Sequence, residues 1–289
     1  MMNQSDPPSE DELARQRNAA WERLDQIRSA IEAGDAENAL VWVTDLHAQL
    51  QNAQDPYLRS CVMHAVALRG EALEWLSRPE EALAAYTEAA ELGVDEADPD
   101  IRYERVGALY DKAQLLVELE RDQEVAATLG ELLTEFYNDP PEGRLELVID
   151  AQLLLAGRVA ALGQTDLALA GYDSIVEQYG GRRERWARDS VARARLSKAG
   201  ILASHDVLAA EALYREVLAA IDGESPGSYR VPYAVALNGC AWTAEQLGRT
   251  DEAAGLHRRV IETFERGENP RVDEEIDFAE EALARRSAN

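Results

Sequence analysis

The sequence predicts an all-α protein made of six helix pairs followed by one more helix. Helical spacing is the first observation, because Ala168, Tyr172, Ile175, Val176 and Tyr179 fall on one face of an amphipathic helix. Repetition is the second, since the same pattern heads six copies that lie 42 or 43 residues apart. The anchors of these copies are Ala39, Ala82, Val125, Ala168, Ala210 and Ala253. The sequence shows neither the alternation of apolar and polar residues that is typical of strands nor a β-hairpin signal. We therefore expect a right-handed superhelical solenoid, in which each pair covers the next.

The chain begins with a polar segment, residues 1–9, that contains Pro7-Pro8 and is expected to be disordered. Ser9 followed by Glu12 is typical of a capping box at the start of the first helix. That helix is expected to end near Gly34, and its partner to run from Asp35 to about residue 51. The repeat region is placed at residues 10–268.

The later pairs are expected at about 57–92, 100–137, 141–179, 183–221 and 228–266. Prolines mark most of the breaks, because a proline ends the helix before it and can open the next one. These residues are Pro56, Pro99, Pro140, Pro141, Pro226 and Pro270. A last helix at about 272–286 has one apolar face and one charged face, so residues 269–289 are predicted to form a C-terminal cap and tail.

The charge of the chain restricts its partners. With 55 acidic and 29 basic residues the net charge is −26, and the acidic excess is concentrated in residues 1–150. This charge disfavours nucleic acid and anionic membranes, and it favours a partner with a basic segment. Two widely separated cysteines, Cys61 and Cys240, and the lack of an apolar leader or spanning segment favour a cytoplasmic protein.

Two stretches carry a family resemblance. Leu162-Gly163 is followed by Ala168 and Tyr172, and Leu247-Gly248 by Ala253. This order of Leu-Gly, a short turn, alanine and then an aromatic residue resembles the tetratricopeptide repeat (TPR). The period of about 43 residues is longer than the usual 34 and is similar to a long bacterial variant. The resemblance implies a binding module whose concave groove holds an extended peptide or a partner helix.

No motif indicates catalysis. The sequence contains no phosphate-binding glycine loop, no GxSxG motif and no HExxH motif, and its histidines are scattered. Ser204-His205-Asp206 contains the residue types of a catalytic triad, but adjacent residues at a helix start are better explained as a turn with an aspartate cap. We expect a non-enzymatic protein with no catalytic residue, cofactor or metal.

The resemblance also indicates where a partner would bind, since groove residues in this family come from the first helix of each pair. Counting back from each turn gives Glu71, Trp75, Tyr110, Asp111, Gln114, Arg193, Asn238 and Trp242. An exposed tryptophan in such a groove is a good binding hot spot. The alternative is that Trp75 and Trp242 only pack between helices.

A basic island interrupts the acidic surface. It follows the one pair break without a proline, Gly180-Gly181. Its members are Arg182, Arg183, Arg185, Arg188, Arg193, Arg195 and Lys198. One hypothesis is a surface that binds a carboxylate or an acidic segment, and the other is ion pairing that stabilises the stack.

The function that these observations predict is a scaffold, adaptor or regulator that binds a protein or peptide. Two rivals stay open. One is self-assembly into a homo-oligomer, and the other is a small-ligand sensor or enzyme with a site inside the superhelix.

Overall fold

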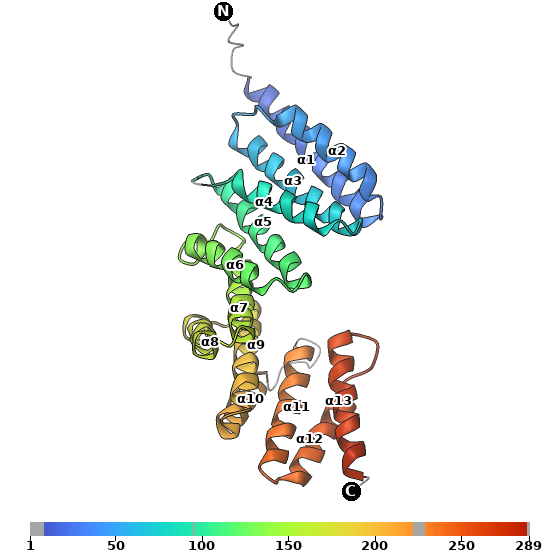
Figure 1. Ribbon diagram of the computed structural model, residues 1–289, viewed down its shortest axis with the longest axis vertical. Coiled ribbons are helices and arrows are strands. Elements are labelled where there is room, and N and C mark those ends of the chain that lie inside the picture. The colour runs from blue at the N-terminus through green and yellow to red at the C-terminus, as the bar shows by residue number, and fades with distance from the viewer. Residues whose placement is uncertain (1–8, 95, 222–228, 288–289) are drawn as a thin grey trace, which may run out of the picture. The chain divides into compact units, whose positions relative to one another are not determined.

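The computed structural model describes residues 9–94, 96–221 and 229–287. Within these ranges all regular secondary structure is helical, in helices α1 to α13 (Figure 1). Residues 1–8 and Pro226, for which the sequence predicts disorder and a pair break, lie outside the described residues. The chain divides into two compact units, residues 1–151 and 152–289, and the boundary falls within α7 (Leu145–Ala161).

Unit 1 contains three helix pairs. They are α1 (Glu10–Glu32) with α2 (Ala36–Leu50), α3 (Pro56–Trp75) with α4 (Pro79–Glu91), and α5 (Pro99–Glu118) with α6 (Asp122–Phe136). The first helices α1, α3 and α5 contact one another in order, and each second helix packs against them (Figure 1). The first helices therefore form one layer and the second helices another.

Unit 2 repeats this plan and ends with the extra helix. Its helices are α8 (Thr165–Tyr179), α9 (Arg185–Leu202), α10 (Val207–Ile221), α11 (Arg230–Gln246), α12 (Thr250–Thr263) and α13 (Pro270–Ser287). Here α9, α11 and α13 are the contacting first-layer helices. The inner face of α13 is buried through Val272, Ile276 and Ala279. The all-α prediction of helix pairs and a final helix is confirmed in the described residues.

The repeated anchor positions form the cores of these pairs. All six anchors, Ala39 to Ala253, have exposed fractions of 0–1%. The position seven residues further along each second helix is equally apolar and at most 3% exposed, as at Leu46 and Ile175. Small anchors let the two helices of a pair approach closely, because a large side chain there would hold them apart.

Local signals set the helix ends. Pro56, Pro79 and Pro99 each occupy the first turn of a helix, where the missing N–H removes no helical hydrogen bond. Ser9 Oγ accepts a hydrogen bond from the Glu12 amide at 3.3 Å, as the capping-box pattern predicts. Asp55 caps α3 in the same way.

The turns inside all pairs but the fifth contain a residue in the left-handed region. Gly34, Gly163 and Gly248 take φ values of +80°, +79° and +74°. At the corresponding turns of the second and third pairs, Ser77 and Glu120 take φ values of 56° and 57°. Side chains at these φ angles are strained, whereas glycine is not.

Arginines join consecutive helix pairs. An arginine near the start of one first helix reaches a carboxylate that lies just before, or caps, the next one. The pairs are Arg17 with Asp55 (2.5 Å), Arg59 with Glu96 (2.5 Å), Arg102 with Asp139 (2.8 Å) and Arg230 with Glu268. Several of these guanidinium groups also lie over an aromatic ring, as Arg17 does over Tyr57. We call this series the arginine ladder.

Candidate binding site

A cavity of about 260 Å³ opens on the first-helix layer of unit 1. Its lining combines three first helices, one second helix and the turn before α7. The lining residues are Arg28, His64, Ala67, Leu68, Glu71, Tyr86, Glu104, Gly107, Ala108, Asp111 and Arg144. Polar groups that converge on a cavity are typical of a binding site.

Two glycines make room for this lining. A Cβ atom on Gly70 would lie 2.5 Å from the Tyr86 ring, so the ring reaches across α3 only because that side chain is missing. A Cβ atom on Gly107 would similarly lie 3.0 Å from a terminal nitrogen of Arg144. Both positions are thus adapted to let a side chain from a neighbouring element cross a first helix.

Three charged or polar side chains from α1, α3 and α5 form a relay along the cavity. Arg28 Nη2 lies 2.7 Å from His64 Nε2, and His64 Nδ1 lies 2.9 Å from Glu104 Oε2. Because arginine can only donate and an ionised carboxylate can only accept, the ring carries its proton on Nδ1 and accepts at Nε2. The charges of Arg28 and Glu104 are therefore already engaged with His64.

Glu71 and Asp111, by contrast, make no hydrogen bond or ion pair with any other described residue, although both are half-buried. Burial raises the pKa of Glu71, and the charge of Arg28 only partly offsets this. Burial also raises the pKa of Asp111 to about 6, against the opposing charge of Arg144. Nearby carboxylates, including Glu71, add to this rise. The cavity thus holds two carboxylates that form no ion pair with either of the two arginines in its lining.

Next to the cavity, the same face of α3 carries an acidic and an aromatic side chain. Glu74 accepts a hydrogen bond from the Tyr86 hydroxyl, and burial raises the pKa of Glu74. Trp75 follows Glu71 by one helical turn and is 60% exposed. Since positions i and i+4 share a helix face, Trp75 lies on the same side of α3 as Glu71.

The other predicted groove residues differ in how far they are buried. Gln114 and Arg193 are exposed, and Tyr110 and Trp242 are half-buried. Tyr110 and Arg193 already take part in interactions. Asn238, which the sequence predicts to face the groove, is instead buried. It is 4% exposed, and its amide nitrogen donates to the Glu275 carbonyl and to the Glu275 carboxylate, both at 2.8 Å. Its amide ties α11 to α13 and does not face a groove.

The basic island is largely engaged inside unit 2. Arg195 pairs with Glu216 at 3.1 Å and Lys198 with Asp173, while Arg188 donates to the Ala220 carbonyl at 2.7 Å. These contacts favour the stabilising hypothesis for those three side chains. Arg185 also takes part in an interaction. Arg182 and Arg183, in the turn before α9, are exposed.

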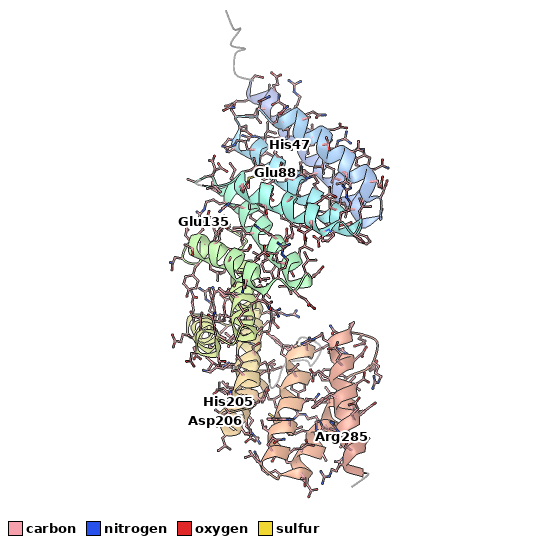
Figure 2. All side chains as sticks on the ribbon, viewed as in Figure 1. His47, Glu88, Glu135, His205, Asp206 and Arg285 are labelled. Carbon is pink, nitrogen blue, oxygen red and sulfur yellow. The ribbon has the colours of Figure 1, made fainter. Side chains whose placement is uncertain are left out.

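The remaining polar motif is a helix start. His205 and Asp206 lie together in the turn before α10 (Figure 2). Asp206 Oδ1 accepts from the Ala209 amide at 3.0 Å, and Ser204 Oγ donates to the Ile201 carbonyl at 3.2 Å. These are local capping bonds. In the described part of the chain no group of three or more histidine, cysteine or acidic side chains is placed to hold a metal ion, and no helix is long and apolar enough to cross a membrane.

Sequence comparisons give no relatives, since neither a protein-family model nor a curated protein matches the chain. Solved structures do match. BtubC (BKLC) from P. vanneervenii aligns with a TM-score of 0.61 and 16% identity over 96% of this chain and 93% of its own. A kinesin light chain from Podospora anserina with nearly identical TPR-like repeats aligns at 0.54, with 14% identity over 71% of this chain and 96% of its own. The fold is TPR-like.

A third TPR-like match is NprR, the quorum sensor from B. thuringiensis. Its apo form aligns with a TM-score of 0.60 and 15% identity, over 91% of this chain and 69% of its own. NprR has also been solved with its cognate peptide NprX, and that structure aligns with a TM-score of 0.51. At identities of 14–16%, these matches establish that the proteins share a fold.

Of the predicted groove residues, Glu71 and Asp111 line the cavity, and Trp75 lies on the same face of α3 as Glu71. His64 and Glu104 were not among the predicted groove residues. His64 precedes Glu71 by seven residues, and Glu104 precedes Asp111 by seven residues. Seven residues are two helical turns, so this spacing could have placed both side chains on the groove face. Arg144 comes from a turn and carried no comparable signal.

Proposed function

We propose that the chain is a non-enzymatic binding module of the long-period TPR type, which holds a basic segment of a partner protein or peptide on the first-helix layer of unit 1. The observation that supports this most directly is the pair Glu71 and Asp111. Ionised carboxylates that are half-buried and unpaired raise the free energy of the unbound state. A lysine or arginine side chain entering the cavity would supply an ion-pair partner for them.

Other features of the same face fit such a partner. Trp75 offers an aromatic surface near the cavity for the aliphatic part or the charge of a basic side chain. The net charge of −26 would attract a basic segment from a distance and speed its association. NprR, which shares the fold, was solved with a peptide bound. We propose a cytoplasmic scaffold, adaptor or regulator on these grounds.

The test is a titration followed by fluorescence anisotropy. Labelled peptides of equal length, one rich in lysine and arginine and one with those residues replaced by glutamine, are titrated with the full chain. The double variant Glu71→Gln/Asp111→Asn should weaken binding of the basic peptide by about tenfold or more, because two half-buried carboxylates lose their charge. Trp75→Ala should weaken it by a similar factor.

The control is Asp45→Asn. Asp45 is exposed on α2 in the second-helix layer of the same unit, so the variant removes one acidic charge away from the cavity. It should leave the affinity within about twofold. Equal affinity for both peptides, or equal weakening by the cavity variant and by Asp45→Asn, would refute the proposed function.

A further inference from the structure

The turn between α8 and α9 holds a second cavity, of about 430 Å³, in unit 2. In contrast to the cavity of unit 1, all charged side chains that line it in the described part of the chain are basic. It is lined by Tyr179, Gly180, Gly181, Arg182, Arg183, Arg188, Val191, Arg195 and Ala220. Four arginines around one cavity are notable in a chain with about twice as many acidic as basic residues.

Arg182 is held in place by aromatic rings. Its guanidinium carbon lies 5.6 Å from the Tyr179 ring centroid and 5.5 Å from that of Trp186. These rings meet edge to face, with centroids 5.8 Å apart. Stacking fixes the plane of the guanidinium while leaving its N–H edges for other partners, and among the described residues the nearest carboxylate oxygen, of Glu184, is 3.9 Å away.

The guanidinium group of Arg183 forms no ion pair with the described residues. Its side chain is exposed and makes no hydrogen bond or ion pair with the described residues, while its backbone amide donates to Glu184 Oε2 at 2.9 Å. The Glu184 carboxylate is therefore held by the loop that precedes α9, and it accepts no capping hydrogen bond from the amides of α9. The first amides of this 18-residue helix therefore receive no capping hydrogen bond from the Glu184 side chain.

We propose that this cavity binds an oxyanion group, carboxylate or phosphate, carried by a peptide segment, with Arg182 and Arg183 as its main donors. Arginine donates in parallel to two oxygens of such a group. Arg188 and Arg195 keep their structural contacts and add positive potential from the wall of the cavity. Because this site lies in unit 2 and is independent of the cation cavity of unit 1, either site can fail its test without the other.

The test uses three labelled peptides of one sequence, with glutamate, phosphoserine or serine at the central position, and inorganic phosphate as a competitor. Anisotropy gives the affinities, and the change in intrinsic fluorescence that is lost in Trp186→Phe gives a local readout, because Trp186 lies next to Arg182. We expect the glutamate or the phosphoserine peptide to bind at least about tenfold more tightly than the serine peptide.

The decisive variant is Arg183→Glu, because this side chain has no partner among the described residues whose loss would disturb folding. It should reduce binding of the anionic peptides by about tenfold or more and leave the thermal melt unchanged. Arg182→Gln should act in the same direction. The matched control is Arg258→Gln, which removes an exposed charge on α12 outside the cavity and should change affinity by less than about twofold.

Three results would overturn the proposal. One is no preference for an anionic peptide over the serine peptide, and another is equal weakening by Arg183→Glu and Arg258→Gln. The third is binding of inorganic phosphate as tightly as the phosphoserine peptide, which would exclude a peptide-borne ligand. The basic peptide used for unit 1 serves as a folding control, since its affinity should not fall in Arg183→Glu.

Discussion

Replacing Asp111 with asparagine should make the protein more stable and a poorer binder of basic peptides. In the free protein the Asp111 carboxylate is half-buried and forms no ion pair with the described residues, and burial raises its pKa to about 6. Asparagine has nearly the same shape and carries no charge, so the variant removes the penalty of burying the charge. A residue that destabilises the fold while it serves binding is typical of a functional site.

The size of the effect follows from the pKa. A rise from 3.8 to about 6 corresponds to about 3 kcal/mol of unfavourable free energy for the ionised form in the folded state. Since the folded pKa lies above the unfolded one, Asp111 reduces stability progressively as the pH rises from about 4 through 6. At pH 8 the asparagine variant should be more stable by up to about 3 kcal/mol, and near pH 4 the two proteins should differ little.

Urea denaturation at pH 8 and at pH 4.5, followed by circular dichroism, measures this difference. Asp45→Asn is the control and should change stability by less than about 0.5 kcal/mol at both pH values, because its carboxylate is exposed. A variant Asp111→Asn that is less stable than the wild type at pH 8, or a gain of equal size at both pH values, would refute the reasoning.

Four further predictions concern stability. Gly70→Ala should destabilise by about 1–3 kcal/mol in urea denaturation because its Cβ meets an aromatic ring, whereas Gly130→Ala, with nothing within 4 Å, should stabilise by up to about 1 kcal/mol. Glu120→Gly should raise the urea midpoint by relieving a left-handed backbone, and an unchanged or lower midpoint would contradict this. Arg105→Met should lower the free energy of unfolding by about 2–4 kcal/mol, since the buried guanidinium bonds one carbonyl and two carboxylates, and a loss below about 1 kcal/mol would contradict it. Burial lowers the pKa of His257, so thermal melts should show stability falling as the pH drops below 6.5, and less so in His257→Gln.

The repeat pattern was visible in the sequence because it depends on local spacing. Each anchor, such as Ala82 or Val125, recurs at the same place on a helix, and its burial follows from the pairing of that helix with its partner. The prolines and aspartates at the helix starts affect only the backbone groups next to them, so the helix starts could be predicted from the local sequence. These features need no knowledge of how distant segments meet.

The candidate site was only partly predictable for the opposite reason. Glu71 and Asp111 could be assigned to the first-helix face by counting along one helix. The relay of Arg28, His64 and Glu104 joins three helices, and its existence depends on their relative depth and rotation. Asn238 was misassigned because its helix face is covered by α13, a contact that periodicity within α11 does not reveal.

The arginine ladder has a consequence for how such a chain can lengthen. Asp55 accepts from the pair before it, and Arg59, on the next turn of the same helix, donates to the pair after it. A duplicated gene segment of one helix pair would therefore encode both halves of the joint, an acid toward one neighbour and an arginine toward the other. An array built this way can gain or lose whole units by in-frame recombination without inventing a new contact surface.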